Sequence, residues 1–295
     1  MTRTTYGQKI RVVTDSVADL PWDLAHRLGI QVVPIYVILG GKSYLADAAL
    51  DSAWFYREWE RYDQRSQTAA PPPEEFLAAY GELVAEGATD IIGLFLASPL
   101  SSIVRHARQA AKFLNEDEAR VHIVETGQVS MGVGWMAIAA AEAIAQGATL
   151  PEVLALLEGM RARTYVRGVL ASLDHLRRGG RVGWAAVQMA GWLRIKPIIS
   201  YAQSEAKLAG HVRTYHRALE RLTNFVTTIA PIERLAIIHS RAPQEALDQL
   251  QGDLAALIDA PLLTVEVGPI FGTHVGPKGI GVAVVRAEPV EKVKA

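Results

Sequence analysis

Short runs of β-branched and other apolar residues alternate with segments of helical period through the first half of the chain. Strands are expected at residues 10–14, 31–39, 90–96 and 121–124, and helices at residues 21–28, 52–62, 74–86, 101–114, 129–145 and 151–161. The run at 90–96 is apolar throughout, as expected of a parallel strand that is covered on both faces. Strands that alternate with helices in this way predict βαβ units and a doubly wound parallel sheet.

The second half of the chain has a different order of elements. Strands are expected at residues 164–171, 195–201, 207–213, 235–239, 262–267 and 280–285, and helices at residues 214–229, 243–257 and around 184–193. This mixed order indicates a smaller α+β domain. Because 295 residues are more than one hydrophobic core usually serves, the prediction is an α/β protein with two domains, at residues 8–163 and 164–288.

Composition excludes several classes of function. The chain has no cysteine, so disulfides, thiolate nucleophiles and cysteine-ligated metals are excluded. The net charge is −1, so the chain lacks the excess of basic residues that is typical of nucleic-acid-binding proteins. The N-terminal residues contain no secretory signal, and the apolar run at 131–145 is too short to span a bilayer. We therefore expect a cytoplasmic protein with a buried helix at 131–145.

An aromatic cluster at residues 54–59 allows two interpretations. Core packing of Trp54 or Phe55 is favoured, because large aromatic side chains are mostly buried. The alternative is a flap over a ligand tunnel, which would give at most a transient contact with a membrane.

Hydroxyl and carboxyl side chains follow three of the expected strands. They are Asp15-Ser16, the segment from Ser98 to Ser101, and Glu125-Thr126. Ligands bind beyond the carboxyl ends of strands in open α/β sheets, and a helix N-terminus beside hydroxyls suits an anionic oxygen pair. Helix capping alone would also place Ser, Thr and Asp there.

Three further segments are candidates for an anion site. Thr68 lies in an expected loop at 64–73 that ends in three prolines, where no helix needs it as a cap. Arg181 follows a Gly-Gly pair that would direct it into a cleft between the domains, although a solvated basic helix end is the simpler alternative. His274 lies among glycines in an expected loop at 272–279, where it binds a ligand or makes a structural hydrogen bond.

The segment from Gly132 to Ala137 fits a dinucleotide-binding fingerprint, Gly-x-Gly-x-x-Ala. Its glycines fall inside the expected helix, well past the strand end, and Trp135 would crowd a pyrophosphate. Close packing of helix on sheet is the favoured reason for these glycines. No phosphate-binding loop, metalloprotease or nucleophile-elbow motif occurs.

Taken together, these segments resemble the DegV family of bacterial fatty-acid-binding proteins over about residues 9–285. The resemblance rests on motifs in the family's order: Val12-Val13-Thr14-Asp15-Ser16, Val32-Val33-Pro34, Thr68 with Pro71, Ser98-x-Leu100-Ser101, Arg177-Arg178-Gly179-Gly180-Arg181, Ile195-Lys196-Pro197-Ile198 and His274-Val275-Gly276-Pro277.

The resemblance implies two intertwined α/β domains that enclose a long-chain fatty acid. It assigns the carboxylate to Thr68 and Ser101, with Arg181 and His274 near the head group. It also implies, for some members, that a separate ATP-dependent kinase phosphorylates the bound acid. Ser98 and Lys278 complete the expected ligand-binding set. Ala69, Ala70, Ile103 and Lys278 depart from the family's head-group pattern.

Burying a methylene is worth about 0.8 kcal/mol, so the roughly fourteen methylenes of a C16 acid supply on the order of 11 kcal/mol as an upper bound. Association costs several kcal/mol of this. The prediction is therefore a carrier with no cofactor and no catalytic activity. The alternatives are an enzyme in the same cleft, either a hydrolase with Ser101 and His274 or a nucleotide-dependent enzyme, and a pure interaction protein.

Overall fold

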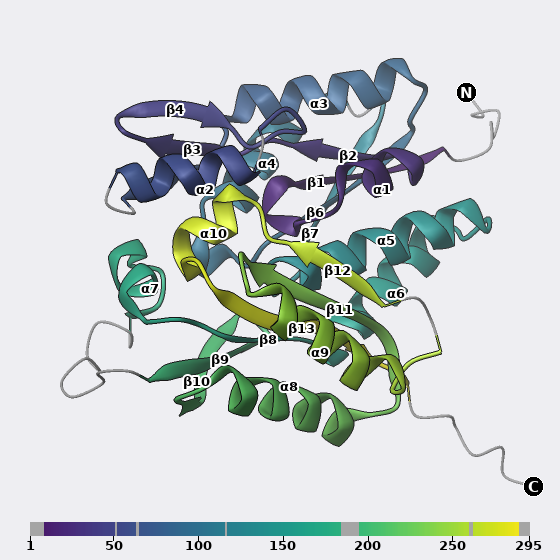
Figure 1. Ribbon diagram of the computed structural model, residues 1–295. Helices are drawn as coiled ribbons and strands as arrows, with labels where there is room; N and C mark the ends of the chain where they lie inside the picture. The colour runs from purple at the N-terminus through teal and green to yellow at the C-terminus, as the bar shows by residue number, and fades with distance from the viewer. Residues whose placement is uncertain are drawn as a thin grey trace, which may run out of the picture.

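A computed structural model describes residues 9–50, 52–62, 65–115, 117–183, 195–259 and 262–288. The helical stretch expected around 184–193 lies outside these residues. Two main sheets lie one above the other, with a helix between them, and a small third sheet lies beside the first (Figure 1).

The first sheet is parallel, as predicted. Its strands are β1 (Ile10–Asp15), β2 (Ile30–Val33), β6 (Asp90–Phe95) and β7 (Arg120–Glu125), in the order β2-β1-β6-β7. Helices α3 (Pro73–Ala85) and α4 (Ile103–Ala111) lie on one face and α5 (Met131–Ala145) on the other, while α1 (Trp22–Arg27) contacts β2 (Figure 1). Every residue of β6 is buried, which explains why its sequence does not alternate.

The second sheet is mixed, and it contains more strands than the first. They are β8 (Thr164–Val169), β9 (Lys196–Ala202), β10 (Glu205–Val212), β11 (Ile232–Ser240), β12 (Leu263–Glu266) and β13 (Gly279–Arg286), in the order β10-β9-β8-β13-β11-β12. Helices α8 (Tyr215–Ile229) and α9 (Gln244–Ala255) cover its outer face (Figure 1). Leu222 and Leu250 are fully buried in the separate core that they form.

The single strand predicted at 31–39 is wrong. The chain leaves the first sheet after Val33, because Pro34 has no N–H group and the N–H of Ile35 donates to Ser16 Oγ instead. It then forms β3 (Tyr36–Leu39), which pairs antiparallel with β4 (Lys42–Leu45) and β5 (Ser66–Ala69) in a third sheet. The loop predicted at 64–73 is therefore wrong as well, because part of it is β5.

Helix α5 lies between the two main sheets and belongs to the core of both. It contacts β1 and β6 on one side and β8, β11 and β13 on the other. Its residues from Met131 to Ala141 are all buried, which explains why it shows no polar face. The prediction of a buried helix is confirmed. Among the described residues, no helix has the length and apolarity that crossing a membrane requires.

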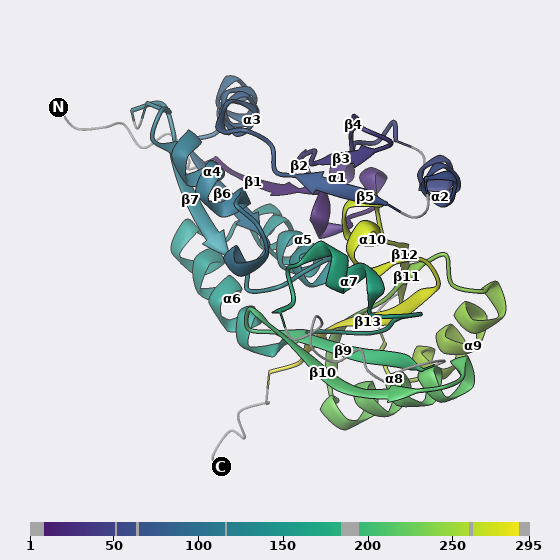
Figure 2. The ribbon, with the colours of Figure 1, turned by 90° about the vertical axis from the view of Figure 1, so that its left-hand side faces the viewer.

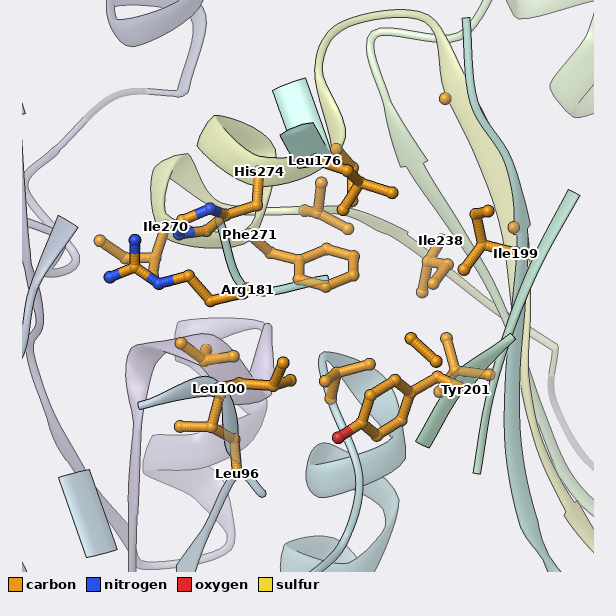
Figure 3. A pocket seen from close by; sticks show the side chains of 18 of the residues that line it. Leu96, Leu100, Leu176, Arg181, Ile199, Tyr201, Ile238, Ile270, Phe271 and His274 are labelled. Atoms are coloured by element: carbon orange, nitrogen blue, oxygen red, sulfur yellow. The ribbon is translucent and has the colours of Figure 1, made fainter. Parts of the chain in front are cut away.

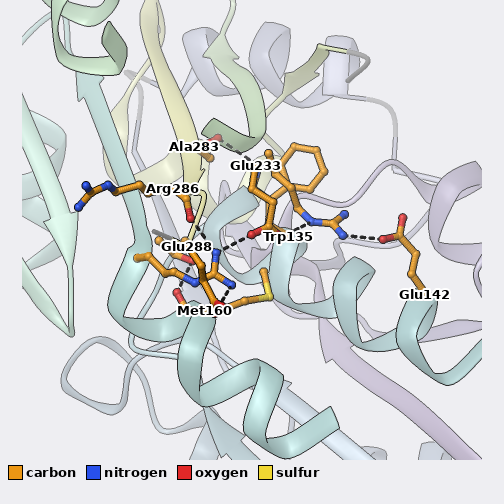
Figure 4. A network of polar contacts seen from close by, with 10 residues as sticks. Trp135, Glu142, Met160, Glu233, Ala283, Arg286 and Glu288 are labelled. Carbon is orange, nitrogen blue, oxygen red and sulfur yellow. Dashed lines mark hydrogen bonds and ion pairs between the residues drawn. The ribbon is translucent and has the colours of Figure 1, made fainter. Parts of the chain in front are cut away.

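A network of ion pairs fixes α5 and the following helix, α6 (Leu150–Arg163), to the second sheet (Figure 4). Arg163 at the end of α6 pairs with Glu233 and Glu288, and Arg234 on β11 pairs with Glu142 on α5. The Trp135 indole N–H donates to the carbonyl of Ala283 at 3.1 Å. These contacts hold α5 and α6 against the second sheet.

The last helix, α10 (Pro269–Val275), reaches from the C-terminal half into the N-terminal half. It contacts the short helix η1 (Ser16–Ala18), α2 (Ser52–Arg61), α7 (Asp174–Gly179), β3 and β5. Figure 2 shows it below the three-stranded sheet and next to α2. The two halves are therefore interleaved in space. Phe55, Tyr56 and Trp59 of α2 are buried, so the core interpretation of this aromatic cluster is confirmed.

Candidate ligand-binding cavity

A cavity of about 200 Å³ lies between the carboxyl ends of the first sheet and the inner face of the second. The chain order of the strands reverses at β1 and β6, because β2 lies on one side of β1 and β6 on the other. The cavity is lined at this point by Val17, Leu96 and Leu100, which follow these two strands. Strands β8, β9, β11 and β13 supply the opposite wall. Binding at such a reversal of strand order is the general expectation for open α/β sheets.

Most of the wall is aliphatic or aromatic. Figure 3 shows Phe271 projecting into the cavity, with Ile199 and Ile238 beyond it toward the second sheet. Leu96, Leu100, Leu176 and Ile270 line the same space. An apolar wall of this kind favours a ligand with a hydrocarbon body.

Several polar side chains of the cavity gather where β5, α4, α7 and α10 meet. Thr68 and His274, which are 206 positions apart, are joined by a hydrogen bond of 3.1 Å between Oγ1 and Nε2. His274 lies in the last turn of α10, so the loop predicted for it is wrong. Its Nδ1 makes no hydrogen bond to any described residue, and Gly179 leaves the space beside that atom.

Burial, together with the neighbouring guanidinium of Arg181, lowers the pKa of His274 to about 4. The imidazole is therefore neutral at pH 7. Arg181 follows Gly180, whose positive φ of 66° ends α7 and turns the chain toward the cavity. Its Nη1 donates to the carbonyl of Gly179 at 2.6 Å, and Figure 3 shows it beside His274. Arg181 thus supplies the charge at this end.

Ser101 also lines the cavity. Its Oγ accepts the N–H of Ile103 at 3.3 Å, at the start of α4. Ser102 rather than Ser101 is the N-cap of α4, and it makes no side-chain capping bond. The contact of Ser101 with Ile103 leaves its hydroxyl proton free to be donated. Among the described lining residues no Asp or Glu occurs, so an anion at this end meets donors and one cation without an opposing carboxylate.

The structure does not bring Ser98 or Lys278 to the cavity wall. Ser98 is exposed, and its N–H donates to the carboxylate of Glu125. Lys278 is exposed at a positive φ of 62°, and its carbonyl accepts the hydroxyl of Tyr215. Its backbone rather than its side chain is built into the fold.

Sequence reasoning missed several lining residues. Tyr201, His239 and Ser240 lie on β9 and at the end of β11, inside strands that show only an apolar pattern. Burial lowers the pKa of His239, and Arg241 adds to this effect. No local signal distinguishes these positions, because their place depends on how the two sheets face each other.

The residues behind the two enzyme alternatives make other contacts in the structure. A Cβ on Gly132 would lie 2.9 Å from Val166 Cγ2, and one on Gly134 would lie 2.9 Å from the carbonyl oxygen of Ala18. These glycines therefore serve close packing, as expected, and leave no room for a nucleotide. His274 bonds to Thr68, and Ser101 Oγ bonds to a backbone N–H. The described residues thus contain no Ser101–His274 pair that would activate a nucleophile.

Fold and cavity together define an interleaved α/β protein with an apolar internal cavity that ends in hydroxyl, imidazole and guanidinium groups. A family model described as "Uncharacterised protein, DegV family" matches residues 9–287. A DegV domain-containing protein of Streptomyces coelicolor is 32% identical, over 94% of this chain and 99% of its own length.

Solved structures agree with this match. A fatty-acid-binding DegV family protein from Thermus thermophilus is 32% identical with a TM-score of 0.85, covering 95% of this chain and 100% of its own. DegV of Bacillus subtilis, a fatty-acid-binding protein, is 26% identical with a TM-score of 0.84 over the same shares of the two chains. The chain belongs to the DegV family.

Proposed function

We propose that this protein binds a long-chain fatty acid in the cavity between its two sheets. The carboxylate lies against Thr68, Ser101, Arg181 and His274, and the acyl chain lies along the aliphatic wall. The observation that carries the proposal is the composition of this wall, which is mostly aliphatic or aromatic and gathers hydroxyl, imidazole and guanidinium groups at one end, with no acid among its described residues.

The energetics of binding support placing the carboxylate at the polar end of the cavity and the acyl chain along its apolar wall. Each buried methylene contributes about 0.8 kcal/mol, so the tail supplies most of the affinity. A buried carboxylate without partners would cancel much of that gain. Charge-assisted hydrogen bonds, worth about 1.5–3 kcal/mol each, offset its desolvation. The hydroxyls of Thr68 and Ser101 and the guanidinium of Arg181 are suitable donors for such bonds.

The proposal further assigns the protein the role of a carrier without catalysis of its own. The polar end supplies hydroxyls and a neutral imidazole but no paired nucleophile and base. Phosphorylation of the bound carboxylate would then need a separate ATP-dependent kinase, to which the carrier presents the acid. Because Lys278 lies outside the cavity wall, it does not contribute to this head-group site.

Mass spectrometry of the purified protein under native and denaturing conditions tests the carrier. We expect one tightly bound fatty acid per chain, released on denaturation. Thr68→Ala and Ser101→Ala should each weaken binding by about 1–3 kcal/mol, while Thr227→Ala, an exposed threonine on α8, should not. Absence of any bound or bindable fatty acid would refute the function. Undiminished affinity in both cavity variants would refute only the assigned head-group contacts.

A further inference from the structure

A second cavity, of about 280 Å³, lies where the start of the N-terminal half meets the end of the chain. Its wall combines η1 and α1 with β12 and the first residues of α10. Contacts between η1 and α10 close one side of it. No residue lines both this cavity and the fatty-acid cavity, so the two are separate sites.

This second cavity is acidic. Asp15, Asp19, Asp47 and Glu266 line it, and the described lining residues include no Lys, Arg or His. Two of the four acids are committed to other contacts. Asp47 Oδ1 accepts the N–H groups of Ala49 and Leu50 in a turn, and Glu266 pairs with Arg241 at 3.1 Å. Among the described lining residues, Glu266 alone is thereby paired with a cation.

Asp15 is almost completely buried, with 1% of its surface exposed. Its Oδ1 accepts the N–H of Val17 at 2.7 Å, but its Oδ2 makes no hydrogen bond to any described residue. A buried carboxylate oxygen without a partner is costly, and most buried polar groups have one. The fold thus carries an acceptor at the cavity that nothing in the described chain satisfies.

Asp19 lies next to this acceptor and adds to its effect. It is held by the Ser130 hydroxyl and by the N–H of Gly268 at 2.8 Å, in a left-handed conformation with φ of 50°. The charge of Asp15 acts on Asp19 as a repulsion. Two carboxylates held close together in a base-free cavity create a negative potential that favours a cation.

The rest of the wall indicates which kind of cation fits. Leu20, Leu50 and Val265 make part of it apolar, and the indole of Trp22 lies at the cavity with 36% of its surface exposed. Among the described residues, no group of three or more His, Asp or Glu side chains is placed to hold a metal ion. Apolar wall and indole suit an organic cation, because aromatic faces attract ammonium groups and alkyl chains are buried favourably.

We propose that this second cavity binds a small organic ammonium ion, an alkylamine or one end of a polyamine, with its charged nitrogen against Asp15 and Asp19. Its alkyl part lies against Leu20, Leu50 and Val265, and the indole of Trp22 borders the same cavity.

Proton linkage provides a signature of this binding mode. Burial raises the pKa of Asp15 and of Asp19 to about 7. The other ionisable groups around them are Asp47, the Glu266–Arg241 pair and Tyr56 on α2. His274 lies at the far end of α10, where it bonds to Thr68. An ammonium ion that needs one ionised carboxylate displaces one proton, so its affinity should rise about tenfold from pH 6 to pH 8.

Isothermal titration calorimetry with 1,4-diaminobutane and n-butylamine tests the proposal on the full chain. We expect saturable binding of one amine per chain, and a loss of at least tenfold in Asp15→Asn. The matched control is Asp23→Asn, which removes an equal charge from an exposed position on α1 beside the cavity residue Trp22 and should change affinity less than twofold. Circular dichroism verifies that each variant is folded.

Trp22→Ala provides a second test should Asp15→Asn not fold, with an expected loss of roughly threefold. The wild-type pH series needs no variant. The proposal is overturned if the amines do not bind saturably, if Asp15→Asn binds them as well as Asp23→Asn does, or if affinity is flat between pH 6 and pH 8. Tighter saturable binding of Mg²⁺ than of either amine would also overturn it, in favour of a metal site.

Discussion

Replacing Gly179 with alanine should impair ligand binding without replacing any ligand-binding side chain. A Cβ at this position would lie 2.6 Å from Nδ1 of His274, far inside the normal contact distance. The clash pushes the imidazole toward Thr68 or out of the cavity, and the 3.1 Å hydrogen bond between these two side chains is lost or distorted. The change therefore acts on the arrangement of the carboxylate end.

The expected magnitude follows from the number of contacts involved. Displacing one donor from a buried carboxylate costs about 1.5–3 kcal/mol, which corresponds to roughly a 10- to 150-fold weaker fatty-acid affinity. Stability should change much less, because alanine at a helical position gains about 1 kcal/mol over glycine and offsets part of the strain. Gly179 is the last residue of α7, so this gain applies to it.

The assay is a titration of wild type and variant, both stripped of lipid, with a fluorescent fatty acid, together with urea denaturation of the ligand-free proteins. Gly183→Ala is the control, because a Cβ there has no neighbour within 4 Å. Equal affinities of Gly179→Ala and Gly183→Ala would refute the reasoning, since His274 would then be movable at no cost to the site.

Three further changes test the packing and the buried charges by denaturation. Gly132→Ala should destabilise the protein by about 1–3 kcal/mol through its contact with Val166, whereas Gly252→Ala, which has no neighbour within 4 Å, should not; equal midpoints would contradict the packing role. Folding lowers the pKa of His274, so the unfolded wild-type chain takes up the proton more readily, and the wild type should lose up to about 3 kcal/mol of stability as pH falls from 6.5 to 4. His274→Asn should remove this loss; parallel pH profiles of the two proteins would contradict it. Folding raises the pKa of Asp15, so the ligand-free wild-type protein loses stability as this carboxyl ionises. Asp15→Asn should therefore be more stable than the wild type by a margin that grows from pH 4 to pH 7, up to about 4 kcal/mol; a stability difference between the two proteins that does not depend on pH would exclude this cause.

Elements whose sequence pattern reflects their own burial were predictable. The fully buried β6 and α5 appear as continuous apolar segments, and their interiors lie where the pattern places them. The strands of the second sheet likewise lie close to their expected ranges. Their order could not be predicted, because β13, the last strand of the chain, lies between β8 and β11. Such pairing depends on contacts that are distant in sequence.

Short elements that depend on tertiary contacts escaped prediction. Strand β5 consists of Ser66–Ala69, residues with little strand preference, and exists because it pairs with β3. Helix α10 has seven residues and contains Gly272 and the β-branched Thr273, so it is too short and too poor in helix formers to be stable alone. These two elements carry Thr68 and His274, which is why the key pair of the cavity could be named from a family resemblance but not placed in space.

The two cavities differ in charge, and α10 passes between them. Its first turn faces the acidic cavity, where the N–H of Gly268 donates to Asp19, and its last turn holds His274 in the fatty-acid cavity. Free N–H groups at a helix N-terminus favour a carboxylate, and free carbonyl groups at the C-terminus disfavour a nearby anion. The carboxylate of a fatty acid therefore gains nothing from the backbone of α10 and depends on the side chains of Thr68, Ser101, Arg181 and His274. This division explains why the donors of the head-group site come from β5, from the residue before α4 and from the residue after α7 rather than from one helix end.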